Sequence, residues 1–241
     1  SILLLMYLQI ALLTGDFLFA SVVVEDRTYK ATITRDIWGV PHVFGKTDAD
    51  AAFGMAFAHA QDDIKNLTDN ITLYRAEMAL KQGVKGVVSD YLIRALKIKE
   101  MVVEDYESKL SIQVREVIEG YVAGLNYWVD LHPSRDYQSL LPITKYDIVS
   151  GFVIQNLFFS GVVGAIEKIQ SMDAPASKRV AMDQNPLIQS ADLVLGSNAF
   201  AVGSTKTDDG STRLIINSHQ PLEGSLALYE AHITSEEGWN M

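Results

Sequence analysis

The hydrophobic pattern of this chain changes its period once, and this change constrains the fold more strongly than any other feature of the sequence. Between residues 48 and 170, apolar side chains such as Phe53 and Phe57 recur at the spacing of amphipathic helices. After residue 195 the apolar residues alternate with a period of two, as they do in strands. Residues 171–195 contain two prolines and no sustained apolar period, which is typical of a linker. The sequence therefore predicts an α+β chain in which a mostly helical part is joined loosely to a β part.

Local signals place the individual elements. Thr47 can cap a helix whose first turn carries Asp48 and Asp50, where the helix dipole favours negative charge. The sequence Asp-Asp-Gly at 208–210 is typical of a hairpin turn. The expected strands are residues 31–34, 42–44, 198–202 and 213–217, and the expected helices begin after Thr47 and cover residues 64–79, 91–106, 112–131 and 145–170.

The composition excludes several kinds of chemistry. The chain has 241 residues, of which 48% are hydrophobic, and this is too apolar for a disordered protein. It contains no cysteine, which excludes disulfides, thiolate metal sites and cysteine nucleophiles. Its net charge is −10, the wrong sign for holding a phosphate backbone, so nucleic acid is not an expected partner. The sequence also lacks HExxH, P-loop, strand-linked GxGxxG and GxSxG motifs. Histidine, carboxylate and hydroxyl side chains remain for chemistry.

Two apolar runs bear on export and membranes. Residues 2–13 are uncharged and are followed by small residues around Ala20 and Ser21, a pattern that resembles a secretory signal peptide. Residues 1–21 are therefore expected to be a leader, and the protein to be periplasmic or secreted. A buried N-terminal element and a retained lipid anchor are the alternatives. The second run, residues 148–166, is long enough to span a bilayer, but its Gln, Asn and Gly residues and its lack of flanking basic clusters favour a helix buried in a core.

The peptide Gly196–Ser197 lies at the boundary between the expected linker and the first strand of the β part. If this bond were cut, Ser197 would gain a free α-amine, whose reference pKa of about 7.7–8.0 suits a base that activates the serine hydroxyl. The preceding glycine allows the unusual backbone conformation that attack on its own carbonyl requires. From the residues alone, Gly-Ser-Asn is more often an ordinary turn.

Three separated motifs resemble the penicillin acylase family of N-terminal-nucleophile hydrolases. Residues 33–63, ITRDIWGVPHVFGKTDADAAFGMAFAHAQDD, resemble the family's opening pattern, and residues 120–126, GYVAGLN, resemble a helical segment that follows it. GSNAFAV at 196–202 and INSHQPL at 216–222 resemble the start of the family's β-chain. The resemblance covers residues 30–241. The opening-motif residues are Arg35, Asp36, Gly39, Val40, Pro41, His42, Asp50, Phe53, Gly54, Ala58, Ala60, Gln61 and Asp62.

The resemblance implies an exported precursor that cuts itself before a serine, loses a spacer and becomes a two-chain amide hydrolase. It implies the four-layer αββα fold of N-terminal-nucleophile hydrolases, present here in part as a mostly helical α-chain and the first strands of a β-chain. On this sequence, residues 22–170 are α-chain-like, residues 171–196 are the spacer, and the β-chain begins at Ser197, with residues 197–241.

The resemblance also implies roles for individual residues. Gly196 and Ser197 flank the self-cleaved bond, and Ser197 becomes the nucleophile. His219 matches a histidine that assists the serine amine in the cephalosporin, aculeacin and acyl-homoserine-lactone acylases. Without the motif, a histidine at a strand end is more often structural or on the surface. Glu167 lies where many members have a calcium ligand, although a carboxylate after an apolar helix is more often a cap to the buried run. No cofactor is required, and a structural calcium ion is the one metal implied.

The implied substrate is an N-acyl amide of the penicillin, cephalosporin or acyl-homoserine-lactone type, and the implied partner is the remainder of the β-chain. The family places its oxyanion hole farther along the β-chain than Met241, so these 241 residues alone are expected to be inactive. Contact with a membrane is expected only through a leader or an anchor. Two rival functions stay open, namely a non-catalytic binding relative of the family and a membrane-anchored helical protein.

Other polar residues are weaker candidates. Arg35 and His42 belong to the first motif, where a structural role in a turn is the simpler interpretation. His59 is expected to be a packing histidine on a helix face. Asp62 and Asp63 are adjacent, so their side chains do not face each other on a helix, and a solvated helix end is expected there.

Overall fold

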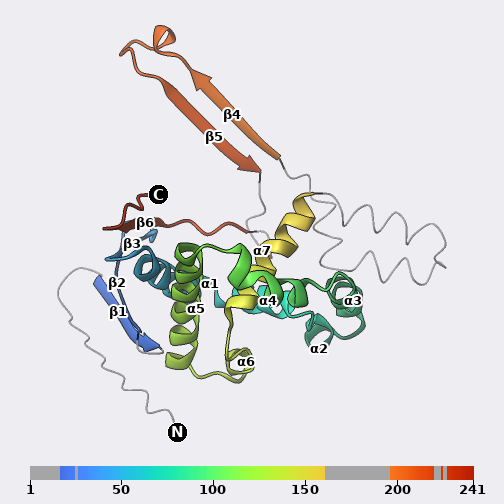
Figure 1. The fold of residues 1–241 in the computed structure, drawn as a ribbon. Coiled ribbons are helices and arrows are strands. Elements are labelled where there is room, and N and C mark those ends of the chain that lie inside the picture. The colour runs from blue at the N-terminus through green and yellow to red at the C-terminus, as the bar shows by residue number, and fades with distance from the viewer. Residues whose placement is uncertain (1–16, 25–26, 161–195, 220–223, 225–226) are drawn as a thin grey trace, which may run out of the picture. The chain divides into compact units, whose positions relative to one another are not determined.

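A computed structural model describes residues 17–24, 27–160, 196–219, 224 and 227–241 (Figure 1). These residues fall into two compact units. The first contains the chain up to Leu157 together with Tyr229–Met241, and the second lies within residues 158–228. Each unit is described by itself.

Taken together, the two units confirm the expected mixture of helices and strands. The first unit holds strands β1 (Phe17–Val24), β2 (Arg27–Arg35), β3 (Pro41–Gly45) and β6 (His232–Ser235), helices α1 (Asp48–Tyr74), α2 (Met78–Gln82), α3 (Val87–Ala95), α4 (Ile98–Lys109), α5 (Ile112–Leu131), α6 (Arg135–Gln138) and α7 (Lys145–Phe159), and the 3-10 turn η1 (Gly83–Gly86). The second holds strands β4 (Gly196–Val202) and β5 (Arg213–His219) with the 3-10 turn η2 (Ser204–Lys206) between them.

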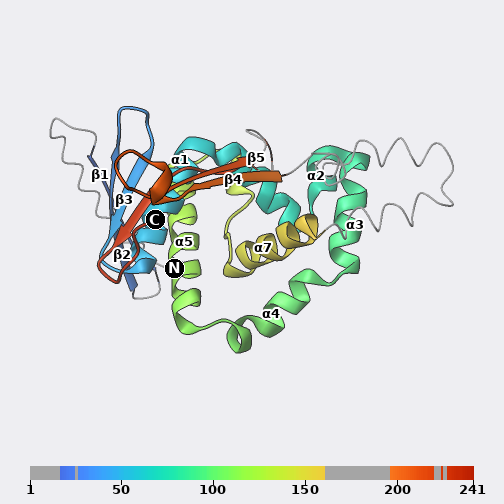
Figure 2. The same ribbon diagram turned by 90° about the horizontal axis from the view of Figure 1, so that it is seen from above.

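The first unit is built on a four-stranded sheet of order β1-β2-β3-β6. β1, β2 and β3 are antiparallel neighbours, whereas β6 returns from the far end of the sequence and pairs parallel to β3. Helices α1 and α5 pack against each other, and both lie against the sheet (Figure 1, Figure 2). Ile33 and Val43 of the sheet and Phe53 of α1 are buried between these layers, so the apolar faces of the strands and helices share one core.

Two glycines allow α5 to cross α1 closely. A Cβ atom on Gly120 would lie 2.2 Å from the carbonyl oxygen of Ala49, and one on Gly124 would lie 2.2 Å from that of Phe53. Both separations are shorter than any ordinary van der Waals contact, so only glycine fits at either place. This close approach gives the GYVAGLN motif a packing role.

Helix α1 begins as the sequence predicts. The Thr47 hydroxyl accepts a hydrogen bond from the Asp50 backbone N–H, and the Asp50 carboxylate accepts one from the Thr47 backbone N–H, which completes a capping box. The Asp50 carboxylate also accepts a bond from the Lys30 backbone N–H of β2, at 3.0 Å. The cap therefore ties the start of the helix to the sheet.

The helical region departs from expectation at two breaks. The helix expected at residues 64–79 is the second half of α1, which ends at Tyr74 and is followed by α2. The helix expected at residues 91–106 is divided into α3 and α4 by Lys97, whose φ of 52° lies in the left-handed region. A left-handed residue cannot continue a right-handed helix, so the chain turns there.

Two expectations concern residues that are described only in part. Of the leader expected at residues 1–21, residues 1–16 lie outside the described residues. Residues 17–21 form the beginning of strand β1, in which Ala20 is buried and pairs with Ala31. The helix expected at 145–170 is described as far as Phe159. Among the described residues, none of the helices has both the length and the apolar content needed to cross a membrane.

The second unit is an antiparallel hairpin of β4 and β5 (Figure 1). Phe200 lies opposite Ile215, and Ile216 lies opposite Ala199 on the other face. Phe200, Ile215 and Ile216 are 62%, 59% and 69% exposed, so both faces of the hairpin carry exposed apolar side chains. A strand pair that is apolar on both faces is typical of a sheet buried on both sides.

Candidate active site

The hairpin brings the three residues expected at the cleavage site to one end of β4 and β5. Gly196 lies opposite His219, and Ser197 lies opposite Ser218. Because successive side chains of a strand point to opposite faces, the Ser197 side chain lies on the face opposite to that of His219. In the uncut chain the pairing register therefore brings His219 beside the Gly196–Ser197 peptide and not beside the serine side chain.

His219 has a polar partner on its own face. Its Nε2 lies 3.0 Å from Nδ2 of Asn198. With the amide in this orientation, Asn198 donates the hydrogen bond and Nε2 accepts it, so neutral His219 carries its hydrogen on Nδ1. His219 and Asn198 are both exposed, and so is Ser197.

The first motif forms a polar cluster that joins the β2–β3 turn to helix α1. Nη1 of Arg35 donates to the Gly39 carbonyl oxygen at 2.8 Å and to Oδ2 of Asp62 at 2.9 Å. Nη2 of Arg35 donates to Oε1 of Gln61 at 2.9 Å. Inside the turn, the Asp36 carboxylate accepts from two backbone N–H groups. The structural role expected for Arg35 is confirmed.

His42 lies near a second histidine that is distant in sequence. Its Nδ1 lies 3.0 Å from Nδ1 of His232, and its Nε2 lies 3.8 Å from Oδ2 of Asp36. His42 pairs with His232 in the β3–β6 register. Its contacts place it in the junction between strands, in keeping with the structural interpretation.

The expectation of a solvated helix end at Asp62 and Asp63 is confirmed in part. Two helical stretches of α1 meet at Asp63, whose backbone is non-helical, and the second stretch continues to Tyr74. Asp62 is exposed, but it also has protein partners. Asp62 is paired with Arg35 and also accepts a hydrogen bond from the Tyr229 hydroxyl at 2.6 Å. Asp63 accepts bonds from the backbone and side chain of Asn66, as a helix cap does. The Asp62 and Asp63 carboxylates bind different partners, as expected for adjacent helix residues, whose side chains do not face each other.

His59 confirms its expected packing role and leads to a residue that the sequence did not reveal. Its Nδ1 lies 3.1 Å from the Tyr121 hydroxyl, and its ring stacks on Tyr229 at a centroid distance of 4.3 Å. Burial lowers the pKa of His59, against the opposing effect of Asp63 and Asp62. Burial and the hydrogen bond to Asp62 raise the pKa of Tyr229. Tyr229 lies outside the three motifs that resemble the family, and its contact with α1 is seen only in the folded chain.

The expected calcium ligand cannot be placed. Glu167 lies outside the described residues. Within the part of the chain that is described, no group of three or more His, Asp or Glu residues is arranged to hold a metal ion. The calcium site stays a prediction.

Comparison with known proteins identifies the family. The family model described as penicillin amidase matches residues 30–241, which is most of the chain. The chain therefore belongs to the penicillin amidase family, and the expected resemblance is confirmed.

Curated relatives match over most of this chain. The acyl-homoserine lactone acylase PvdQ of Pseudomonas savastanoi pv. phaseolicola is 24% identical over 240 residues, covering 89% of this chain and 30% of that protein. The aculeacin-A acylase of Actinoplanes utahensis is 21% identical over 239 residues, covering 87% of this chain and 30% of that protein. Among solved structures, a thermostable penicillin G acylase from Alcaligenes faecalis matches with a TM-score of 0.42 and 22% identity, covering 67% of this chain and 85% of that one. This chain spans 30% of the length of the two curated relatives.

Proposed function

We propose that this chain is part of an acylase precursor that cuts itself between Gly196 and Ser197 and then hydrolyses N-acyl amides. The observation that carries the proposal is the family match, which includes a Gly-Ser peptide at the exposed start of a strand. Residues 22–170 then form the α-chain, residues 171–196 the spacer, and Ser197 the first residue of the β-chain.

The proposed self-cleavage needs no added reagent except water. The Ser197 hydroxyl attacks the Gly196 carbonyl carbon, and the C–N bond breaks as the acyl group moves from the amide nitrogen to the serine oxygen. Water then hydrolyses the resulting ester. The products are a carboxylate on Gly196, a free hydroxyl and a free α-amine on Ser197.

The same residue then serves as nucleophile and base. The α-amine of Ser197 takes the proton of its own hydroxyl as the oxygen attacks the substrate amide, and it returns the proton to the leaving amine. An acyl-enzyme forms, and water releases the acid. His219 is the proposed assistant of this amine. Its place opposite Gly196 supports the assignment, because the new terminus forms at that point of the register.

The substrate class follows from the names of the relatives. An acyl-homoserine lactone acylase and an aculeacin-A acylase are both similar to this chain over its length. We therefore propose an N-acyl amide substrate of the acyl-homoserine-lactone, penicillin or cephalosporin type.

The remainder of the β-chain is the proposed partner and supplies the oxyanion hole. We also propose that Glu167 holds a structural calcium ion. The apolar run of residues 2–13 supports a periplasmic or secreted location.

Turnover by the complete gene product that contains this chain tests the proposed nucleophile. Hydrolysis of an N-acyl-homoserine lactone and of an N-phenylacetyl amide is followed for the wild type, Ser197→Ala and Ser218→Ala. Ser218 lies opposite Ser197 in the hairpin, so its variant is a matched control for loss of a strand hydroxyl. We expect Ser197→Ala to lose at least about 10³-fold in kcat/KM, since removal of a nucleophile removes the covalent route. Ser218→Ala should retain activity. An active Ser197→Ala enzyme would remove the basis of the proposed mechanism.

A further inference from the structure

Residues 229–241 follow the hairpin in sequence, yet they belong to the first unit. Strand β6 within this segment adds to the β3 edge of the sheet, with Val43 opposite Ile233 and Gly45 opposite Ser235. If the chain is cut before Ser197, this segment becomes part of the second chain. Its contacts with β3 and α1 then become contacts between two separate chains.

Residues 229–241 also make hydrogen bonds with one another. Ile233 and Met241 exchange two backbone hydrogen bonds of 2.7 and 3.0 Å, and the Ser235 N–H donates to the Trp239 carbonyl oxygen at 3.0 Å. Gly238, with a φ of 129°, provides the turn between the two arms. The segment is therefore a small hairpin, whose other edge is free to pair with β3.

Backbone pairing joins this small hairpin to the sheet. The N–H groups of Ile233 and Ser235 point to the arm at 239–241, so alternation along the strand directs the Thr234 N–H to β3. The Glu236 N–H, which donates to the Gly45 carbonyl oxygen at 3.3 Å, follows the same alternation. The Thr234 hydroxyl adds a bond of 3.2 Å to the Val43 carbonyl oxygen. Pairing of this kind covers the open edge of β3.

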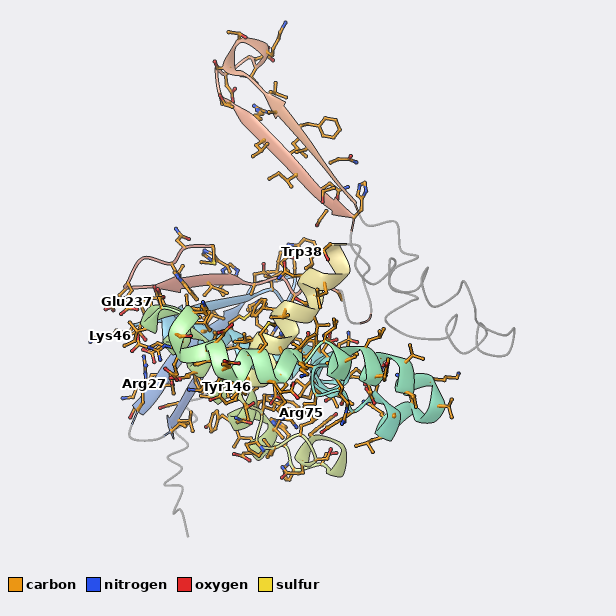
Figure 3. The ribbon with its side chains drawn as sticks, turned by 45° about the vertical axis from the view of Figure 1, so that its right-hand side comes forward. Arg27, Trp38, Lys46, Arg75, Tyr146 and Glu237 are labelled. Atoms are coloured by element: carbon orange, nitrogen blue, oxygen red, sulfur yellow. The ribbon has the colours of Figure 1, made fainter. Side chains whose placement is uncertain are left out.

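Side chains fix the segment to the first turn of α1. The Ser235 hydroxyl donates to Oδ1 of Asp48 at 2.5 Å, and it accepts from the N–H groups of Gly238 and Trp239. Oε2 of Glu237 accepts from the Asp48 backbone N–H at 2.8 Å. A carboxylate at this position also interacts favourably with the positive end of the helix dipole. Figure 3 shows Glu237 near Lys46, at the end of the sheet where α1 begins.

The other end of the segment is attached near the kink of α1. The Tyr229 hydroxyl donates to Asp62, which is itself paired with Arg35, and the Tyr229 ring stacks on His59. Contacts at both ends and along β6 thus bind one short segment to two elements of the first unit, β3 and α1.

We propose that residues 229–241 form a clamp that holds the second chain on the first after cleavage. The proposal rests on the self-cleavage proposed above, and it assigns to this segment the task of chain association. The clamp binds the β3 edge by strand addition and the start of α1 through Ser235 and Glu237. Hairpin β4–β5, which precedes the clamp on the same chain, is thereby kept attached to the α-chain part.

The test makes the cut with an added protease, so that it does not depend on self-cleavage. A recognition sequence for a site-specific protease is inserted within residues 171–195 of the 241-residue chain, in a Ser197→Ala background. After cleavage, native mass spectrometry and size-exclusion chromatography report whether the two pieces stay together. We expect the cut protein to remain a 1:1 complex.

Two variants then weaken the clamp to different degrees. Thr234→Pro removes the N–H directed to β3, and Leu228→Pro, at an exposed position outside β6, is its matched control. We expect the cut Thr234→Pro pieces to separate and the Leu228→Pro pieces to stay together. The milder Ser235→Ala removes the hydrogen bond to Asp48, which joins the two pieces, and two bonds within residues 229–241. It should raise the Kd of the cut pieces by about tenfold to a hundredfold. Circular dichroism of the uncut variants checks that they are folded.

The outcomes separate the two proposals. Cut Thr234→Pro and Ser235→Ala pieces that stay together as tightly as the wild type would overturn the clamp, because other contacts would then hold the chains. That result leaves self-cleavage intact. A gene product that never cuts itself before Ser197 would instead overturn the proposed function, even if residues 229–241 bind as described.

Discussion

The buried carboxylate of Asp147 shows how single residues hold the helical part together. It accepts two hydrogen bonds from the Arg75 guanidinium, at 3.0 and 2.8 Å, and its side chain is 5% exposed. It also accepts from the backbone and hydroxyl of Thr144. Burial alone would raise the pKa of Asp147, but the bonds from Arg75 and Thr144 outweigh burial and lower it. The pair ties the end of α1 to the start of α7.

Asp147→Asn should therefore reduce stability and change its pH dependence. Breaking a buried ion pair costs about 3–5 kcal/mol, because the remaining charge loses its partner. Since the folded-state pKa of Asp147 lies below the unfolded one, its contribution is present above the unfolded value of about 3.9 and is lost as the pH falls through the folded value. Urea unfolding at pH 7 should show the full difference between wild type and variant, and the difference should shrink on acidification below about pH 4.

Asp209→Asn in the hairpin provides the control for this prediction. Asp209 pairs with Arg213 on an exposed surface, so its loss should change the urea midpoint little. An Asp147→Asn protein as stable as the wild type at pH 7, or one whose deficit is unchanged at pH 3, would contradict the role given to the Arg75 pair.

The residues whose role depends on local sequence could be predicted, and those whose role depends on distant contacts could not. Thr47 and Asp50 form the expected cap because both lie within one turn of the helix start. The hydrogen-bond partners of Asp62 were missed because Arg35 and Tyr229 lie 27 and 167 residues away in the sequence. Ser197 and His219 came from the family resemblance, and their roles remain proposals.

At the scale of elements, the crossing of α1 and α5 depends on space and not on side-chain chemistry. Gly124→Ala would place a Cβ atom 2.2 Å from the Phe53 carbonyl oxygen, so the two helices must move apart. We expect a loss of stability of about 1–3 kcal/mol, as for other overpacked cores, and a lower Tm. Differential scanning calorimetry measures the change.

Gly203→Ala is the matched control for Gly124→Ala. A Cβ atom at Gly203 meets nothing within 4 Å, and its backbone has an ordinary φ of −71°. It should leave the Tm nearly unchanged. Equal stability of the Gly124→Ala and wild-type proteins would show that the helices do not need this close approach.

The elements themselves differ in how well the sequence predicts them. Helix α5 has the bounds expected for it, Ile112–Leu131, because its apolar period is uninterrupted and Ser111 caps it. The break at Lys97 was missed because lysine carries no local signal for the left-handed region that its backbone adopts. Strand β6 was not expected, because the four residues of HITS form a strand only by pairing with β3, some 190 residues earlier in the sequence.

At the scale of the whole molecule, the proposed cleavage site and the segment that follows the hairpin belong to different units. The apolar residues exposed on both faces of the hairpin fit a sheet that further strands and layers would cover. The α+β class could be predicted from periodicity, whereas the return of residues 229–241 to the first sheet is a long-range pairing that no local pattern contains.

The central claim is that a serine becomes a chain terminus, and the N-terminal sequence of the mature product tests it most directly. The complete gene product is purified as wild type and as Ser197→Ala, and the chains are analysed by intact mass and N-terminal sequencing. The account predicts two chains for the wild type, the second beginning with Ser197, and one uncut chain for the variant. A wild-type enzyme that is active as a single uncut chain, or whose second chain begins elsewhere, would contradict the account.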